Sequence, residues 1–101
     1  MATLEAKIAF DTTAEAELGS LNMNGRRGTV SVVSSQAGTL KVYWSPGLSA
    51  RIELASEATS VASSLNYKII DLDQCLLNIE ATFTPDAASS GDWVVVEGAA
   101  Y

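Results

Sequence analysis

The stretch CLLNIEATFT, residues 75–84, decides the fold because its side chains alternate along the chain. One side of it is apolar and consists of Leu77, Ile79, Ala81 and Phe83. The other side is mostly polar, with Leu76, Asn78, Glu80, Thr82 and Thr84. Side chains of a β-strand point alternately to opposite faces, so this period of two predicts a strand with one buried face.

Shorter segments repeat the alternation on both sides of this stretch, at residues 28–34, 39–44, 51–55, 65–69 and 92–97. The residues predicted to face inward are Val30, Val32, Leu40, Val42, Trp44, Ile52, Leu54, Leu65, Tyr67 and Ile69. The last segment, with Trp93 and three successive valines, indicates burial on both faces or pairing with another element. No segment between the strands is long enough for a crossover helix, which disfavours a parallel sheet.

Turn residues separate the segments at intervals of about ten residues, which is typical of a sandwich or small barrel. We expect Gln36-Ala37-Gly38 to close a hairpin, Pro46-Gly47 to begin the next turn, and residues 85–91 to form a loop. The sequence therefore predicts an all-β antiparallel β-sandwich, jelly-roll or immunoglobulin-like, over residues 21–101.

The first twenty residues form a separate unit of the prediction. Leu4, Ala6, Ile8 and Phe10 alternate with Glu5 and Lys7, as in a strand. Residues 12–18 fit a short helix or a second strand, of which we favour extended structure. Two alternatives stay open for residues 1–20: a first hairpin of the sandwich, or an extended arm of roughly 60 Å at about 3.3 Å per residue that crosses a neighbouring subunit.

Composition limits the partners and the chemistry. The 101 residues include twelve acidic and six basic side chains, a net charge of −6, and no histidine. Negative charge disfavours nucleic acid and anionic membrane surfaces as partners. The single cysteine, Cys75, precludes an internal disulfide, and the start of the chain lacks the apolar core of a signal peptide, so we expect a protein that is made in a reducing cytoplasm and is not secreted by the standard route.

No arrangement of residues predicts catalysis. A nucleophile beside a base, a phosphate-binding glycine loop and a metal-ligand spacing are all lacking, and Asp71 with Asp73 supplies too few oxygens for calcium. We therefore expect no enzyme, no cofactor and no metal. Tyr43 is predicted to point outward and Trp93 to either face, and exposed rings of this kind stack on sugars or anchor protein interfaces.

The segment GTLKVYWS (residues 38–45), followed by Pro46-Gly47, resembles small β-sandwich decoration (cement) and related virion proteins of tailed bacteriophages. Residues 77–84, 87–91 and 93–96 match the later strand, small-residue loop and closing strand of that pattern, so the resemblance covers about residues 28–97. The usual Asp-Gly turn is replaced by Pro46-Gly47, and the bulky aromatic residue that often follows it is absent.

The resemblance implies a structural virion protein on the outer capsid surface, assembled in the host cytoplasm. Its expected partners are the major capsid protein and further copies of itself, as a homo-oligomer, and it would stabilise the capsid by bridging coat subunits. We place the assembly contacts at Leu4, Ile8, Phe10 and Tyr101. The alternatives are a carbohydrate-binding or adhesin module that uses Tyr43 and Trp93, and a phage tail or fibre component.

Overall fold

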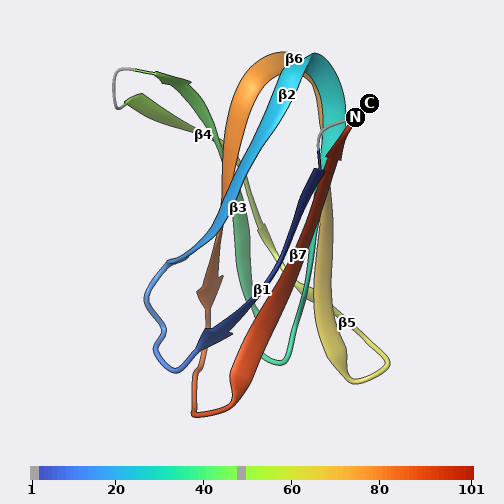
Figure 1. Ribbon diagram of the computed structural model, residues 1–101. Helices are drawn as coiled ribbons and strands as arrows, with labels where there is room; N and C mark the ends of the chain where they lie inside the picture. Colours follow the sequence, from blue (N-terminus) through green and yellow to red (C-terminus); the bar gives the residue numbers. More distant parts are fainter. Residues whose placement is uncertain (1–2, 48–49) are drawn as a thin grey trace.

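The computed structural model describes residues 3–47 and 50–101, which form seven strands (Figure 1). In chain order these are β1 (Thr3–Phe10), β2 (Ala16–Ser34), β3 (Gly38–Gly47), β4 (Ala50–Ala58), β5 (Ser60–Ala62), β6 (Leu65–Pro85) and β7 (Asp92–Ala100). All of the strand pairs are antiparallel, so the predicted all-β antiparallel sandwich is confirmed. Within the described ranges there is no helix of the length and apolarity needed to cross a membrane.

Two layers arise because β2 and β6 are long enough to belong to both. Residues 16–22 of β2 pair with residues 78–83 of β6, and residues 28–34 pair with residues 66–72. The register shifts between these two blocks, and Asn24 and Gly25 there have positive φ angles of 54° and 72°. An irregularity of this kind bends a strand and raises its twist. The two strands therefore arch over one end of the molecule (Figure 1).

We call one layer the terminal layer, because it contains both ends of the chain; it consists of β1, β7, residues 28–34 of β2, residues 66–72 of β6, and β5. The other is the hairpin layer, named after the β3–β4 hairpin. It consists of residues 16–22 of β2, residues 78–85 of β6, β3 and β4. The β3–β4 hairpin extends beyond the sandwich at its tip (Figure 1).

The core lies between the two layers and draws on both. Its largest fully buried side chains include Phe83, Leu21, Met23, Leu40 and Ile79. Half-buried residues of β1 pack against this core, and the ring of Phe10 lies 6.1 Å from that of Phe83. Residues 79, 81 and 83 thus face inward as the alternation of CLLNIEATFT predicts, and so do Val30, Val32 and Val42.

Three predicted inward positions are wrong in the first half of β6. Leu65, Tyr67 and Ile69 are exposed, and Ile70 and Leu72 of the opposite face are buried instead. The inward face of residues 66–68 is polar: Asn66 donates to the carbonyl oxygen of Ser34, and Lys68 pairs with Glu57 of β4 at 3.4 Å. Because these polar groups are satisfied where β4 and β5 cross between the layers, the apolar row turns outward.

Two other inward predictions are also wrong. Leu77 is 63% exposed because it lies just after the β6 bend, before the regular ladder of residues 78–85 begins. Ile52 is exposed because it belongs to the part of the β3–β4 hairpin that extends past the core. Trp44, its cross-strand neighbour, is half-buried.

The hairpin predicted at residues 36–38 is not formed. The chain crosses there from one layer to the other. β2 ends in the terminal layer and β3 begins in the hairpin layer, where β3 pairs with β4 and β6. Ser35 and Gln36 donate hydrogen bonds to the carboxylate of Asp92 at 3.0 and 3.1 Å, which ties the crossing to β7. The turn expected after Pro46-Gly47 falls at residues 48–49, outside the described residues, as does the side chain of Cys75.

Residues 3–10 are a strand of the sandwich, and its hydrogen-bonded partner is β7. The segment is therefore not detached from its own chain, and its partner is the last strand and not the one that follows it. Residues 11–14 form bends, and extended structure resumes at Ala16 as we favoured. β1 passes close to β2 at Gly19 (φ 139°), where a Cβ atom would lie 2.8 Å from Cδ1 of Leu4. Glycine permits both this approach and this φ angle.

Candidate interaction surfaces

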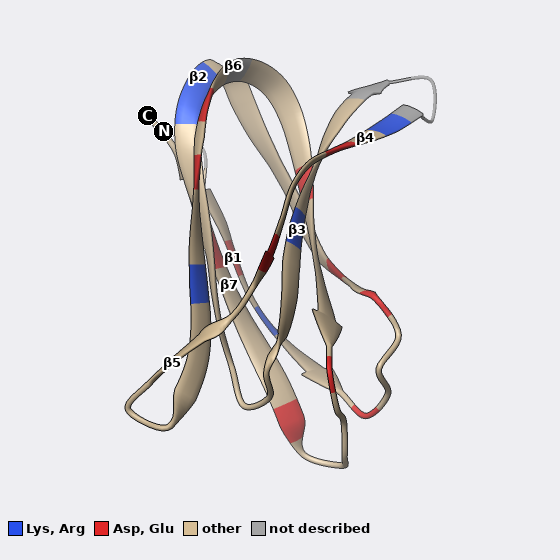
Figure 2. Ribbon diagram, turned by 180° about the vertical axis from the view of Figure 1, so that it is seen from behind, with Lys and Arg blue, Asp and Glu red and all other residues tan. Residues whose placement is uncertain are grey.

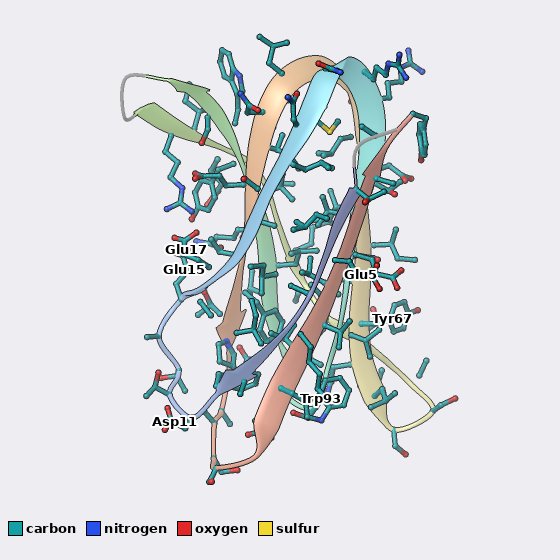
Figure 3. The ribbon with its side chains drawn as sticks, viewed as in Figure 1. Glu5, Asp11, Glu15, Glu17, Tyr67 and Trp93 are labelled. Carbon is teal, nitrogen blue, oxygen red and sulfur yellow. The ribbon has the colours of Figure 1, made fainter. Side chains whose placement is uncertain are left out.

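The outer face of the terminal layer presents its side chains in rows that follow from strand register. One row consists of Lys7, Val95, Val33 and Tyr67, contributed by β1, β7, β2 and β6. The next row consists of Glu5, Glu97, Ser31 and Ile69 from the same strands. Figure 3 shows Glu5 and Tyr67 projecting from this side of the molecule, opposite Glu15 and Glu17.

An apolar band runs across this face, formed by Leu65, Tyr67, Ile69, Val33 and Val95. Ile69 is 58% exposed, Tyr67 37% and Leu65 39%, and the two valines are half-buried. A contiguous exposed apolar patch on a small domain is typical of an interaction site. The band is therefore the leading candidate for contact with a partner.

Charge on the same face is unevenly placed. Glu5 and Glu97 stand directly opposite each other on β1 and β7, and like charges in that position are destabilising. Lys7, two residues along β1 on the same face, lies over the ring of Trp93, with Nζ 5.3 Å from the ring centroid. The acidic pair thus adjoins the band, and the nearby ammonium group is held on the face by an aromatic ring.

The outer face of the hairpin layer carries a compact polar network. Glu15 accepts hydrogen bonds from the hydroxyl groups of Tyr43 and Thr82, both at 2.7 Å. Arg51 pairs with Glu17 at 3.1 Å and with Glu80 at 3.0 Å. Acidic and basic segments lie close together where β3 and β4 leave the sandwich (Figure 2).

Hydrogen bonds set the ionisation of this network. The Tyr43 hydroxyl, and after it that of Thr82, lowers the pKa of the Glu15 carboxyl, because both donate to its charged form. The same bond to Glu15 raises the pKa of Tyr43, since it favours the protonated phenol. A hydrogen bond to Glu53 of β4 raises the pKa of Lys41 in the same way. The acidic groups of this network are thus paired with hydroxyl and basic groups of the same network, whereas the side chains of the apolar band are exposed or half-buried.

A second carboxylate, Asp92, fixes the loop before β7. The backbone N–H of Ser89 donates to it at 2.9 Å and is the main cause of its lowered pKa, with Gln36 and Ser35 adding side-chain bonds. The backbone N–H of Trp93 in turn donates to the Ser35 hydroxyl at 3.0 Å. Trp93 is thereby held half-buried at the start of β7, near the end of the molecule opposite the arch (Figure 3).

Three of the four predicted assembly residues lie on one face of β1, and the fourth, Tyr101, lies apart from them. Leu4, Ile8 and Phe10 share the inner face of β1 and pack against the core. Tyr101 is 61% exposed at the chain end, where its backbone N–H donates to the carbonyl oxygen of Arg27 at 2.8 Å. Tyr43 faces outward as predicted, half-buried beneath the guanidinium of Arg51, whose Cζ lies 4.1 Å from the ring centroid.

The described residues also line at least two pockets. One, of about 120 Å³, lies between β4 and the β6 bend and is lined by Leu54, Leu72, Leu76, Asp71 and Asp73 among others. The other adjoins Phe10 and Asp11 at the far end of β1. Among residues 3–47 and 50–101, no three Cys, Asp or Glu side chains are grouped so as to hold a metal ion.

Reasoning from sequence missed the apolar band because Leu65, Tyr67 and Ile69 were assigned to the core. The available signal was the unbroken valine run of residues 94–96, which indicated burial or partners on both faces of β7.

Neither the models of known protein families nor the curated proteins match this chain.

Proposed function

We propose that the protein is a structural assembly module of the virion-decoration type, which binds a capsid lattice and adjoining copies of itself. The observation that carries the proposal is the apolar band on the outer face of the terminal layer. Burying Ile69, Tyr67 and Leu65 against a partner would remove apolar surface from water, at roughly 25 cal/mol per Å². A second protein surface supplies that burial.

The mechanism is passive and needs no reacting group. A protein that binds the assembled lattice more tightly than free coat subunits stabilises the assembled state by mass action. The net charge of −6 suits the outside of a particle better than an interior lined with nucleic acid. The resemblance of residues 28–97 to phage decoration proteins points to the same setting.

The carbohydrate-binding alternative has less support from the aromatic residues. The ring of Tyr43 is covered by Arg51, and that of Trp93 by Lys7. A sugar stacking on either ring would first have to displace a cation from it. Neither ring offers a free flat platform.

The test is to compare particles assembled with and without this chain. We expect electron microscopy to show additional density on the capsid exterior, and capsids that lack the chain to release their nucleic acid at a lower temperature. Adding the purified protein back should restore both properties. Density confined to the tail would favour the tail or fibre alternative, and a lack of binding to any part of the particle would refute the proposal.

A further inference from the structure

We infer that the outer face of the terminal layer binds a second copy of this chain, in a twofold-symmetric dimer with the two faces stacked. The inference deepens the proposed function. It rests on that function only in placing the dimer on a capsid. The dimer itself follows from the rows of side chains on the face, which belong to the isolated protein.

The order of the rows selects one position for the twofold axis. In a face-to-face dimer the twofold axis lies in the plane of the interface. When that axis is perpendicular to the strands, each strand lies over the same strand of the other copy, and the order of the rows along the strands is reversed. If it passed through the row of Glu5 and Glu97, carboxylates would oppose carboxylates; if it passed through the row of Lys7, two ammonium groups would meet. Midway between the two rows, each Lys7 faces Glu5 of the other copy.

The same axis position also matches the apolar residues. Tyr67 occupies the Lys7 row on β6, and Ile69 occupies the Glu5 row. Each tyrosine therefore packs on the isoleucine of the other copy, and this contact occurs twice. Val95 meets the aliphatic part of Glu97 in the same way, which brings a second carboxylate near Lys7. Opposite charges at the β1 side and two tyrosine–isoleucine contacts at the β6 side thus arise from a single operation, which also places Leu65 over Asp71 of the other copy in the next rows.

The area available fits a reversible dimer. Two further rows flank the two described above, that of Ala9 and Trp93 and that of Thr3, Ala99, Thr29 and Asp71. Four strands about 4.8 Å apart and four rows about 6.7 Å apart cover roughly 500 Å² on each copy, or about 1,000 Å² for the pair. This lies at the lower limit for a specific interface, so we expect a weak and reversible dimer. Within a capsid lattice, where local concentration is high, such a dimer would form and would link adjoining copies of the chain.

The experiment measures the mass of the purified protein as concentration rises from sub-micromolar to several hundred times higher. Light scattering after size exclusion should show a shift from 10.6 kDa towards twice that mass. Lys7→Glu and Glu5→Lys should each reduce dimer affinity by about tenfold or more, because each places like charges in contact. Lys41→Glu makes the same change of charge as Lys7→Glu on the opposite face and should leave the dimer intact.

Mixing the two single variants is the decisive measurement. A Lys7→Glu chain opposite a Glu5→Lys chain regains both opposite-charge pairs, so the mixture should form a heterodimer at concentrations at which each variant alone is largely monomeric. The double variant K7E/E5K should likewise dimerise with itself. A wild-type chain that stays monomeric throughout, single variants that dimerise like the wild type, or a mixture that does not associate would each overturn the inference. These results are independent of particle binding, so failure of the dimer and failure of the decoration function are distinguishable.

Discussion

Two adjacent isoleucines in β6 offer a stringent test of the fold, because the structure places them on opposite faces. Ile70 is 4% exposed in the core, whereas Ile69 is 58% exposed on the outer face. Replacing either by alanine loses the same intrinsic β-propensity, so that loss cancels in the difference between the two variants. Truncating a buried isoleucine to alanine costs about 2–5 kcal/mol, and we expect about 3 kcal/mol for Ile70→Ala. Because more than half of Ile69 is already in water, Ile69→Ala should cost less than about 1 kcal/mol.

Urea unfolding followed by tryptophan fluorescence gives both free energies, provided that the m-value is unchanged. Sub-micromolar chain concentration keeps association from contributing to stability. The difference of about 2 kcal/mol corresponds to a separation of about 8–16 °C between the two melting temperatures in a domain of this size. Equal losses, or a larger loss for Ile69→Ala, would mean that the first half of β6 has its other face inward, and would remove the apolar band.

Three further predictions concern the close approach at Gly28, the titration of Glu15 and the hydroxyl of Tyr43. Gly28→Ala would place a Cβ 2.4 Å from a backbone carbonyl oxygen of β7, so we expect a loss of about 1–3 kcal/mol in the free energy of unfolding. Gly25→Ala meets nothing within 4 Å and should cost only about 1 kcal/mol for its positive φ, a comparison that thermal melts can make. The folded-state pKa of Glu15 is below its ordinary value of 4.5, so its stabilising contribution is complete above that value and is lost as the pH falls through the lower, folded-state pKa. Melting temperatures across this range should fall less steeply for Glu15→Gln than for wild type, and identical slopes would exclude the mechanism. Tyr43→Phe should cost up to about 1 kcal/mol in urea unfolding, because it removes the 2.7 Å hydrogen bond to Glu15. Tyr67→Phe, which removes an outward-facing hydroxyl, should be near neutral at sub-micromolar concentration, and equal costs for the two variants would contradict the assignment.

Alternation in the sequence predicted the strands well but could not always assign their faces. Residues 79–83 alternate strictly between apolar and polar side chains, so the face of Ile79, Ala81 and Phe83 was assigned correctly to the core, although Thr82 on the other face is buried as well. Residues 65–72 have apolar side chains on both faces. The prediction used residues 65–69 alone, in which the apolar side chains lie on the face that the structure exposes. Ile70 and Leu72 pack into the core from the other face, and Lys68 on that face pairs with Glu57, which lies on a strand that crosses between layers. A period of two carries no information about such a tertiary partner.

Turn residues likewise predicted where the chain changes direction but not which strands it joins. Gln36-Ala37-Gly38 fits a hairpin and a crossing between layers equally well. The crossing is fixed by hydrogen bonds from Ser35 and Gln36 to Asp92, more than fifty residues away in the sequence. Long β2 and β6 strands that bend into both layers have no simple signature, because Asn24-Gly25 within β2 has the composition of a turn.

The candidate site was only partly accessible to sequence reasoning. The outward orientation of Tyr43 followed from the alternation of its strand, and the strand at residues 3–10 followed from its own period. That β1 pairs with β7 depends on contacts across almost the whole chain, so Leu4, Ile8 and Phe10 could not be placed in advance. The rows of the terminal layer join four strands, and only the register between those strands reveals them.

The pairing of the first strand with the last has a consequence for biosynthesis. Thr3 lies opposite Ala99 and Phe10 opposite Asp92, so β1 lacks its hydrogen-bonded partner until residues 92–99 have left the ribosome. Until then its backbone edge and its apolar row remain open to any other chain that offers an equivalent β7. Where many ribosomes translate one message, this delay favours exchange of the first strand between copies, a process that truncation of β7 would prolong.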